Sequence, residues 1–320
     1  MRKHLNDNEK IEFKYLLELV SSSVNGTAPP IPYEGIKWQS IKMLANYCSV
    51  ESLVANAVLS LDKKYVSPEV YEKFKQNLSV EMLIDGNLSY ENEKILKAFD
   101  ENKIKNIPLK GYFIKKEYPR SDFRSVSDVD IIYDRKQAHS VKKVFSELGY
   151  TFLNEDDNQY HFEKKPMMNI EMHATLVHEN EESYPLLVNQ LDRSTKRDGY
   201  SYSYEMSHED FYIYMLVHNS NHFRIGGMGA RMVLDSYVFL KNHQSELDYD
   251  YLNVMLEKIG IAKYEKRVRE IAFNWFAKPQ AELKFDNIEE YILLRDGSSG
   301  HADGTFDDLY VLLLCLYIGL

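Results

Sequence analysis

The middle of the chain, from about residue 104 to residue 180, carries the pattern that most constrains the fold. Short runs of alternating apolar and polar residues, separated by turn-forming residues, occur there and are typical of strands. On both sides of this block, apolar residues recur at the spacing of an amphipathic helix. The sequence therefore predicts an α+β fold, in which a small sheet is flanked by N- and C-terminal helical regions.

Within the block, the predicted order of elements is strand, helix, strand, strand, strand. They are a strand at 126–133, a helix at 137–148 and strands at 150–153, 159–163 and 169–177. Gly149 marks the end of the helix, because glycine commonly follows the last helical residue. This order predicts a small unit with a mixed sheet. We expect three parts: an N-terminal helical region at 1–100, the α/β core at 101–200 and a C-terminal helical region at 201–320.

The chain is acidic, with 49 Asp and Glu residues against 39 Lys and Arg residues and a formal net charge of −10. Such a surface repels a phosphate backbone, so nucleic acid is a disfavoured partner. A local basic cleft can coexist with an acidic exterior, which leaves tRNA open as a partner.

The chain begins with basic and then polar residues, without the apolar run of a signal peptide. Its most apolar stretch, 309–320, is shorter than the about 20 residues that cross a bilayer, and we expect it to form a buried terminal helix. We therefore expect a cytoplasmic protein without a membrane partner.

The strongest chemical signal is an acidic pair inside the first predicted strand, Ser127-Asp-Val-Asp-Ile-Ile-Tyr133. Side chains alternate between the two faces of a strand, so Asp128 and Asp130 project to one side and apolar residues to the other. Two adjacent carboxylates repel each other unless a positive charge lies between them. Because Mg²⁺ binds one or two carboxylates together with substrate phosphates, the pair indicates metal-dependent phosphoryl or nucleotidyl transfer. The alternative is an exposed strand edge with two solvated aspartates.

A second acidic strand, Met168-Asn-Ile-Glu-Met-His-Ala174, strengthens this interpretation. Glu171 and His173 share one of its faces, and an acidic residue in an apolar strand is costly to bury unless it is paired or binds a metal. If the two strands are neighbours, Glu171 becomes a third ligand or a base for an incoming hydroxyl, and His173 orients it or contacts substrate. The alternative for Glu171 is a simple edge-strand position.

A third segment, Pro108-Leu-Lys-Gly111, is the end of an apolar run followed by a helical pattern. Glycine allows backbone amides to approach a phosphate, and a helix N-terminus is partly positive. The predicted nucleotide-binding residues are Lys110 and Gly111 in this segment, and Arg124 and Ser127 just before the acidic pair.

Together these motifs resemble the family of uncharacterised nucleotidyltransferases, which has the polymerase-β-type nucleotidyltransferase fold. The segments that carry the resemblance are Leu109-Lys-Gly111, Arg124, Asp128-Val-Asp130, Gly149-Tyr150 and Glu171-Met-His173. His218 and Leu234-Asp235 resemble residues of the family's downstream helices. The chain has Lys110-Gly111 where the wider superfamily usually has Gly-Ser or Gly-Gly.

The resemblance implies transfer of a nucleoside monophosphate from a nucleoside triphosphate (NTP) to an acceptor, a small molecule or a protein, with release of pyrophosphate. It also implies that Asp128, Asp130 and Glu171 are catalytic residues that hold two Mg²⁺ ions, for which Mn²⁺ can substitute. Two alternatives stay open: an inactive protein of the same fold that senses nucleotides or binds a partner, and a kinase-type transfer of the γ-phosphate. The three intact carboxylates favour the enzyme, because a degenerate site is expected to lose one.

His218 and His222 have the four-residue spacing of a metal pair on one helix face. Asn219-Ser-Asn221 between them predicts a helix end, and no third ligand is evident in the sequence. We therefore expect His218 to be structural or to contact substrate. The glycine cluster at 226–229 predicts a helix–helix turn, because no preceding strand fits a dinucleotide-binding motif.

Overall fold

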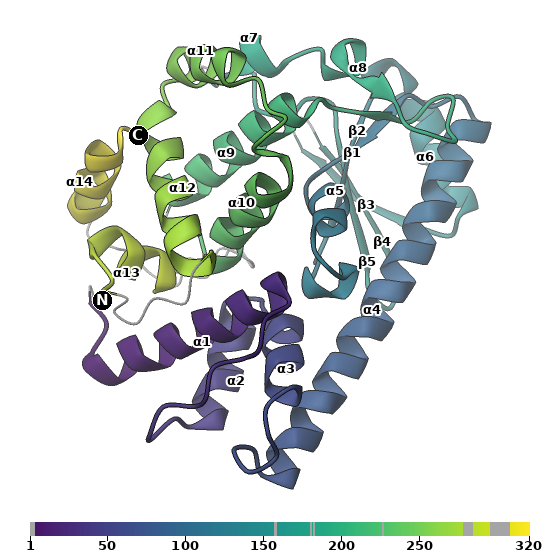
Figure 1. Cartoon of the computed structure of the whole chain (residues 1–320). Helices are drawn as coiled ribbons and strands as arrows, with labels where there is room; N and C mark the ends of the chain where they lie inside the picture. The colour runs from purple at the N-terminus through teal and green to yellow at the C-terminus, as the bar shows by residue number, and fades with distance from the viewer. Residues whose placement is uncertain are drawn as a thin grey trace.

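The structure is a computed structural model of the chain. It describes residues 4–156, 159–179, 181, 183–225, 227–277, 284–294 and 308–320. The expected α+β fold is confirmed: a five-stranded mixed sheet lies beside the C-terminal helices, and the N-terminal helices of residues 7–59 lie below them in Figure 1.

The N-terminal helices are α1 (Asp7–Asn25), α2 (Trp38–Tyr47), α3 (Glu51–Leu59) and α4 (Pro68–Glu101). Helices α2 and α3 are separated at Ser49, whose φ of 53° is incompatible with a continuous helix. The start of α4 is fixed by the Ser67 side chain, which accepts a hydrogen bond from the Val70 backbone N–H. This 34-residue helix runs from the N-terminal helices to the sheet (Figure 1).

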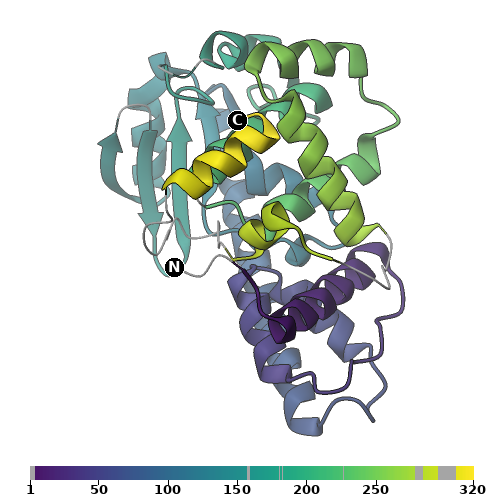
Figure 2. The same cartoon turned by 90° about the vertical axis from the view of Figure 1, so that its left-hand side faces the viewer.

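The sheet has five strands in the order β1-β2-β5-β4-β3. They are β1 (Asn106–Pro108), β2 (Val129–Tyr133), β3 (Thr151–Asp156), β4 (Gln159–Lys164) and β5 (Met168–His173). The β2–β5 pair is parallel and the other three pairs are antiparallel, which is the mixed sheet that the sequence predicts. Figure 2 shows the strands beside the C-terminal helices. Between β2 and β3 lie η3 (Arg135–Gln137) and α6 (Ala138–Glu147).

Alternate residues of β2 face opposite sides of the sheet. Val129, Ile131 and Tyr133 are buried in an apolar cluster together with residues of α4 and α6. Ile132 belongs to a second apolar cluster, which is built mainly from the N- and C-terminal helices. Asp130, between Ile131 and Val129, shares the side of Ile132, so its carboxyl group faces away from α4 and α6.

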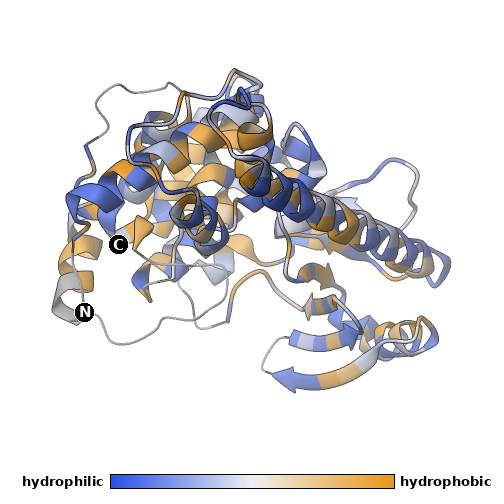
Figure 3. Ribbon diagram, turned by 90° about the horizontal axis from the view of Figure 1, so that it is seen from below, coloured by the Kyte–Doolittle hydropathy of each residue, from blue (hydrophilic) through white to orange (hydrophobic). Residues whose placement is uncertain are grey.

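The C-terminal helices are α9 (His208–Arg224), α10 (Ala230–His243), α11 (Tyr249–Ile259), α12 (Ala262–Phe276), α13 (Asn287–Leu293) and α14 (Asp308–Ile318). Shorter elements connect the parts: α5 (Lys110–Ile114), η1 (Lys115–Glu117), η2 (Ser121–Phe123), α7 (Tyr184–Leu187), α8 (Gln190–Arg193), β6 (Thr195–Lys196) and β7 (Tyr204–Glu205). The helices carry apolar and polar residues in stripes (Figure 3).

The predicted helix end at Asn219-Ser-Asn221 is wrong, because α9 continues to Arg224. The Ser220 hydroxyl donates to the Val217 carbonyl within the helix (2.8 Å), and the Asn221 amide donates to Glu181 outside it (2.9 Å). Since the Ser220 and Asn221 side chains find partners without displacing the backbone hydrogen bonds of the helix, the helix is not broken. Gly227 to Gly229 separate α9 from α10, and Gly226 lies outside the described residues.

The terminal helix α14 is only partly buried, so the prediction of a buried helix is wrong for one of its faces. Leu314, Cys315 and Ile318 are buried. The opposite face is exposed, at 64% for Leu316 and 76% for Tyr317. Among the described residues, no helix combines the length and the apolar character needed to cross a membrane.

Candidate active site

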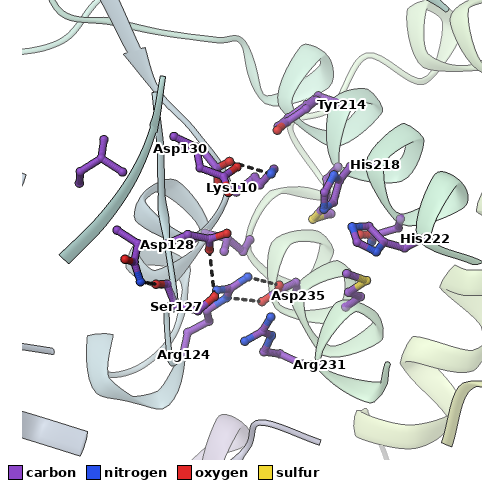
Figure 4. A pocket seen from close by; sticks show the side chains of 18 of the residues that line it. Lys110, Arg124, Ser127, Asp128, Asp130, Tyr214, His218, His222, Arg231 and Asp235 are labelled. Atoms are coloured by element: carbon purple, nitrogen blue, oxygen red, sulfur yellow. Dashed lines mark hydrogen bonds and ion pairs between the residues drawn. The ribbon is translucent and has the colours of Figure 1, made fainter. Parts of the chain in front are cut away.

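A cavity of about 650 Å³ lies between the sheet and helices α9 and α10 (Figure 4). We call one side the sheet wall; it comprises Lys110, Gly111, Arg124, Ser127, Asp128, Asp130 and Glu171. We call the opposite side the helical wall; it comprises Tyr214, His218, His222, Arg231 and Asp235. The cavity therefore brings together residues separated by more than one hundred positions in the sequence.

The parallel pairing of β2 and β5 places Asp130 directly opposite Glu171 in the strand register. Neighbouring strands lie about 5 Å apart, so two carboxylates at paired positions are close neighbours on the same face. Oxygens of Asp130 and Glu171 and a nitrogen of His173 all lie within 4.8 Å of one another. This group can hold a cation through oxygen ligands and one imidazole nitrogen.

Asp130 is the most deeply buried carboxylate of the cavity, with 2% of its surface exposed. Its Oδ1 atom accepts a hydrogen bond from the Lys110 amine and lies equally close to His173 Nε2, both at 2.7 Å. Burial by itself raises the pKa of Asp130, but the charge of Lys110 and the contact with His173 outweigh it and hold the pKa well below its usual range. Asp130 is therefore ionised and already neutralised by a neighbouring cation.

Lys110 reaches Asp130 from an unusual backbone conformation, with a φ of 35°. A positive φ is rare for a residue with a side chain, and such strain is often found at functional positions. Burial opposes the charged amine, but the adjacent Asp130 carboxylate prevails and raises the pKa of Lys110. Lys110 therefore contacts the acidic group itself, whereas the sequence predicts a contact with nucleotide.

Glu171 is more accessible than Asp130, with 27% of its side chain exposed. Its oxygens lie 3.6 Å from His173 Nε2 and 3.9 Å from His161 Nδ1. Burial and the negative charges of Asp130 and Asp128 raise the pKa of Glu171. The pair thus combines a buried, ionised carboxylate with an accessible one.

Asp128 lies just before β2 and lines the same cavity. Its Oδ1 accepts a hydrogen bond from the Ser127 hydroxyl at 3.0 Å (Figure 4). Ser127 is itself exposed, and its backbone carbonyl accepts a hydrogen bond from the Asn169 amide at 3.4 Å. Asp128 therefore lies beside the group formed by Asp130, Glu171 and His173 without belonging to it.

Gly111 lies where a side chain has no room. An added Cβ would come within 3.0 Å of Arg124 and of Val126. Since the space beside its Cα is filled by these two residues, the glycine serves to pack α5 against the segment before β2. From the sequence, the same glycine is predicted to let backbone amides approach a phosphate.

Arg124 connects the two walls. Its guanidinium donates to the Asp235 carboxylate at 3.0 Å, and Asp235 also accepts from the Tyr118 hydroxyl at 2.7 Å. Both charged side chains are largely buried, with 11% of Arg124 and 7% of Asp235 exposed. This ion pair links the segment before β2 to α10.

Arg231, one turn of α10 before Asp235, differs from Arg124 in its hydrogen-bond partners. Its Nε is buried without a hydrogen-bond partner, and its Nη1 donates a long bond of 3.4 Å to the Ser125 carbonyl. Within the described part of the chain, no carboxylate forms an ion pair with it. Burial and the positive charge of Arg124 lower the pKa of Arg231 to about 10, so it stays charged at neutral pH. Its charge is therefore available to an anionic ligand.

His218 and His222 lie on one face of α9, with ring centroids 4.4 Å apart. Burial and the positive charge of Lys110 hold the pKa of His218 well below its ordinary value, and the same two causes lower that of His222. Both rings are therefore neutral at pH 7. Tyr214, one turn before His218, is buried on the same wall, and burial raises the pKa of its hydroxyl.

Comparison with known families decides the identity. A family model described as uncharacterised nucleotidyltransferase matches residues 34–277, which is most of the chain. The chain belongs to this family. The resemblance seen in its motifs is thereby confirmed, and this nucleotidyltransferase is an enzyme by family.

No individual curated protein matches the chain. One similar solved structure is the solution structure of the antibiotic-resistance factor ANT(2'')-Ia, at 13% identity and a TM-score of 0.42, covering 61% of this chain and 100% of that one. Another is the crystal structure of ANT(2")-Ia in complex with adenylyl-2"-tobramycin, at 13% identity and a TM-score of 0.41, covering 54% of this chain and 97% of that one.

The nucleotidyltransferase has cavity residues that the sequence does not single out. They are His161 on β4, Asn169 on β5, Tyr214 on α9 and Arg231 on α10. Arg231 stands four positions before Asp235, which the motif resemblance does include, and a cation one helical turn from a motif aspartate was the available signal. Tyr214 had no comparable signal, because one aromatic residue in an apolar helix resembles any core position.

Proposed function

We propose that the nucleotidyltransferase binds an NTP in the cavity with Mg²⁺, for which Mn²⁺ can substitute, and transfers the nucleoside monophosphate to an acceptor with release of pyrophosphate. The observation that carries the proposal is the pairing of Asp130 with Glu171 on parallel strands, beside Asp128 and facing an unpaired arginine across the cavity. Acidic and basic groups on opposite walls suit a metal-bound triphosphate, because both of its charged components find a partner.

The acidic group fits a hard divalent cation. Its donors are carboxylate oxygens, and the Lys110 amine at 2.7 Å from Asp130 shows that this position already attracts a positive charge. Asp128, Asp130 and Glu171 would hold one or two Mg²⁺ ions. When bound, Mg²⁺ would neutralise negative charge on the phosphate and on the attacking and leaving oxygens.

The protein's own residues would bind and orient the triphosphate. Arg231 offers a guanidinium without a carboxylate partner among the described residues, and a planar guanidinium can bind two phosphate oxygens at once. Lys110 can turn from Asp130 to a phosphate when a metal ion takes over the carboxylate. Arg124 is held by Asp235, so it positions the segment that carries Ser127 and Asp128.

Two groups near Asp130 have separate tasks in this proposal. His173, fixed 2.7 Å from Asp130, keeps that carboxylate oriented toward the cavity. Glu171 is the accessible member of the pair, so it is the group that an acceptor hydroxyl can reach and to which the hydroxyl passes its proton.

The acceptor is a small molecule or a side chain of another protein. A cavity of about 650 Å³ has the size of a small-ligand site. The net charge of −10 opposes binding along a nucleic-acid backbone, which leaves a tRNA end as the least favoured acceptor.

Incubation of the protein with labelled NTP, Mg²⁺ and a cell extract tests the proposal. We expect labelled acceptor and pyrophosphate from the wild-type chain, and none from Asp128→Ala or Asp130→Ala variants whose circular dichroism is unchanged. Release of ADP in place of pyrophosphate would assign γ-phosphate transfer. Nucleotide binding by calorimetry without any turnover would assign a sensing role, and wild-type turnover in either variant would contradict the site assignment.

A further inference from the structure

A second group of metal-binding side chains lies away from the cavity, where the start of α9 meets the end of α10. It consists of His208, the first residue of α9, His243, the last residue of α10, and Glu246 in the following turn. One nitrogen from each histidine and one oxygen of Glu246 lie within 4.8 Å of one another. Glu246 Oε2 is 3.9 Å from His208 Nδ1 and 3.7 Å from His243 Nδ1.

The Nδ1 atom of His243 gives independent evidence for a missing ligand. It is buried and has no hydrogen-bond partner in the described structure. The other ring nitrogen, Nε2, lies 2.8 Å from Glu117 in η1. Glu117 is held in turn by the Asn242 amide, 3.0 Å from its Oε2 atom. The ring is therefore fixed by Glu117, and its free Nδ1 lies 3.7 Å from Glu246 Oε2.

The contact of His243 Nε2 with Glu117 is the kind of contact that the second ring nitrogen of a metal-bound histidine makes. Such histidines usually donate their second ring N–H to a carboxylate, which fixes the ring and increases the basicity of the ligating nitrogen. Two imidazole nitrogens and one carboxylate oxygen are a set that suits Zn²⁺, with a water molecule as fourth ligand. Mg²⁺ prefers oxygen ligands, so this site with two imidazoles and one carboxylate differs from the cavity group, which has two carboxylates and one imidazole.

We propose that His208, His243 and Glu246 form a Zn²⁺ site. Ligand atoms around a tetrahedral zinc ion are about 3.3 Å apart for bonds of about 2.0 Å. The distances from Glu246 Oε2 to the two histidines, 3.9 and 3.7 Å, therefore need to shorten by about half an ångström. Glu246 is in an exposed turn, with 64% of its side chain accessible, and can make this movement.

The site would act on the helical wall from a distance. His208 precedes Tyr214 by six residues on α9 and His243 follows Asp235 by eight on α10, which corresponds to about 9 Å and 12 Å along the helices. A metal ion here clamps the two helices together and, through Glu117, links them to η1. It stabilises the helical wall without contacting substrate.

Binding of Co²⁺ and Zn²⁺ to a variant in which the other candidate group is disabled tests the proposal. The Glu171→Gln/His173→Ala protein lacks two of that group's three ligands and keeps the ion pair between Asp130 and Lys110, and we expect it to bind one Co²⁺ with the visible absorption of a four-coordinate site. Zn²⁺ should displace the Co²⁺ and raise the thermal unfolding temperature, and excess Mg²⁺ should do neither. Absence of Co²⁺ and Zn²⁺ binding by this protein would overturn the proposal.

Single substitutions in the same background identify the ligands. His243→Ala and Glu246→Ala should abolish the Co²⁺ absorption; the exposed position of Glu246 keeps its variant folded even if His243→Ala is unstable. Glu117→Gln should weaken Zn²⁺ binding about 10- to 100-fold, as for other residues that orient a ligand. His139→Ala, at an exposed histidine of α6, is the matched control and should leave binding unchanged. Unchanged metal affinity in Glu246→Ala would rule out the assigned ligand set.

Discussion

The two walls of the cavity differ in chemistry and in how the chain builds them. The sheet wall places its acidic residues on adjacent parallel strands, where backbone pairing fixes Asp130 opposite Glu171. The helical wall takes Tyr214, His218 and Arg231 from two packed helices, so their positions depend on how α9 and α10 pack against the sheet. The sheet wall is therefore fixed by backbone pairing between two strands, and the helical wall by the packing of helices against the sheet.

The walls also differ in how their charges are satisfied. Asp130 is neutralised by the Lys110 ammonium at 2.7 Å and also contacts His173 Nε2, whereas Arg231 has a buried nitrogen without a hydrogen-bond partner. An unpaired buried cation is costly unless a ligand compensates it. Under the proposed function, the Arg231 cation lowers the stability of the helical wall and is compensated when an anionic ligand binds, whereas the charge of Asp130 in the sheet wall is already balanced by Lys110.

Asp130→Asn is expected to have the largest effect, on both folding and activity. It leaves the mostly buried Lys110 ammonium without its partner, and breaking a buried ion pair costs about 3–5 kcal/mol of unfolding free energy. Pyrophosphate release with Mg²⁺ should fall about 10³-fold or more, because the lost metal contact contributes several kcal/mol in the transition state. Urea unfolding and a pyrophosphate assay measure the two effects.

The double variant Lys110→Met/Asp130→Asn separates these effects. Removing both charges takes away the stranded ammonium, so most of the lost stability should return, while pyrophosphate release stays as low as in the single variant. A double variant as unstable as Asp130→Asn would show that the ion pair is not the source of the loss. Recovery of activity would contradict a metal-binding role for Asp130.

Arg231→Met and Arg124→Met form the next pair, because the two arginines are close in space and differ in their partners. Arg231→Met should raise the KM for NTP about 10- to 100-fold, since a hydrogen bond to a charged group contributes about 1.5–3 kcal/mol. The same change should raise the unfolding temperature of the nucleotide-free protein, because it removes an uncompensated cation.

Arg124→Met should have the opposite effect on folding. It leaves the buried Asp235 carboxylate with only the Tyr118 hydroxyl, so the unfolding temperature should fall. Thermal unfolding with and without NTP measures both variants. Equal destabilisation by the two substitutions would remove the distinction between a ligand-binding and a positioning arginine.

The residues of the sheet wall could be predicted from the sequence more fully than those of the helical wall. Asp128, Asp130 and Glu171 stand in short strand patterns that indicate which face each side chain occupies, and the structure brings all three to one cavity. The sequence predicts that these residues lie close together only if the two strands are neighbours. The strand order β1-β2-β5 shows that they are. Local periodicity thus predicted the faces, and only the sheet topology could join them.

Sequence patterns were weaker for the helical wall. Asn219-Ser-Asn221 has low helix propensity, yet burial between helices and hydrogen bonds to Val217 and Glu181 keep α9 continuous. At Gly111 the sequence motif does not reveal that the glycine also packs closely against Arg124 and Val126. In both places tertiary contacts decided what local residue preferences could not.

The two histidines of α9 predict a smaller, pH-dependent effect on the helical wall. His218 is neutral in the folded protein because burial and Lys110 lower its pKa well below 6.5, whereas the unfolded chain binds a proton there near that pH. The unfolded state thus holds more protons below pH 6.5, so folding stability is full above this pH and falls as the pH decreases through it. His218→Gln should reduce this loss by about 1 kcal/mol per pH unit.

Urea unfolding of the wild type and His218→Gln at a series of pH values measures this difference. His222→Gln is the internal comparison and should reduce the acid sensitivity less, because the pKa of His222 is lowered to a smaller extent. Parallel stability curves for the wild type and His218→Gln would show that His218 does not stay neutral in the folded protein.

Tyr118→Phe is expected to have the smallest effect and tests how firmly the two walls are joined. The variant loses the 2.7 Å hydrogen bond from the hydroxyl to Asp235 but keeps the ring in the core and the ion pair with Arg124. Since one intramolecular hydrogen bond contributes about 1 kcal/mol, the unfolding free energy should fall by about that amount and the KM for NTP should change little. If Tyr118→Phe raised KM as much as Arg231→Met, Asp235 would have to position the nucleotide site itself, and the division between a ligand-binding Arg231 and a structural Arg124–Asp235 pair would fail.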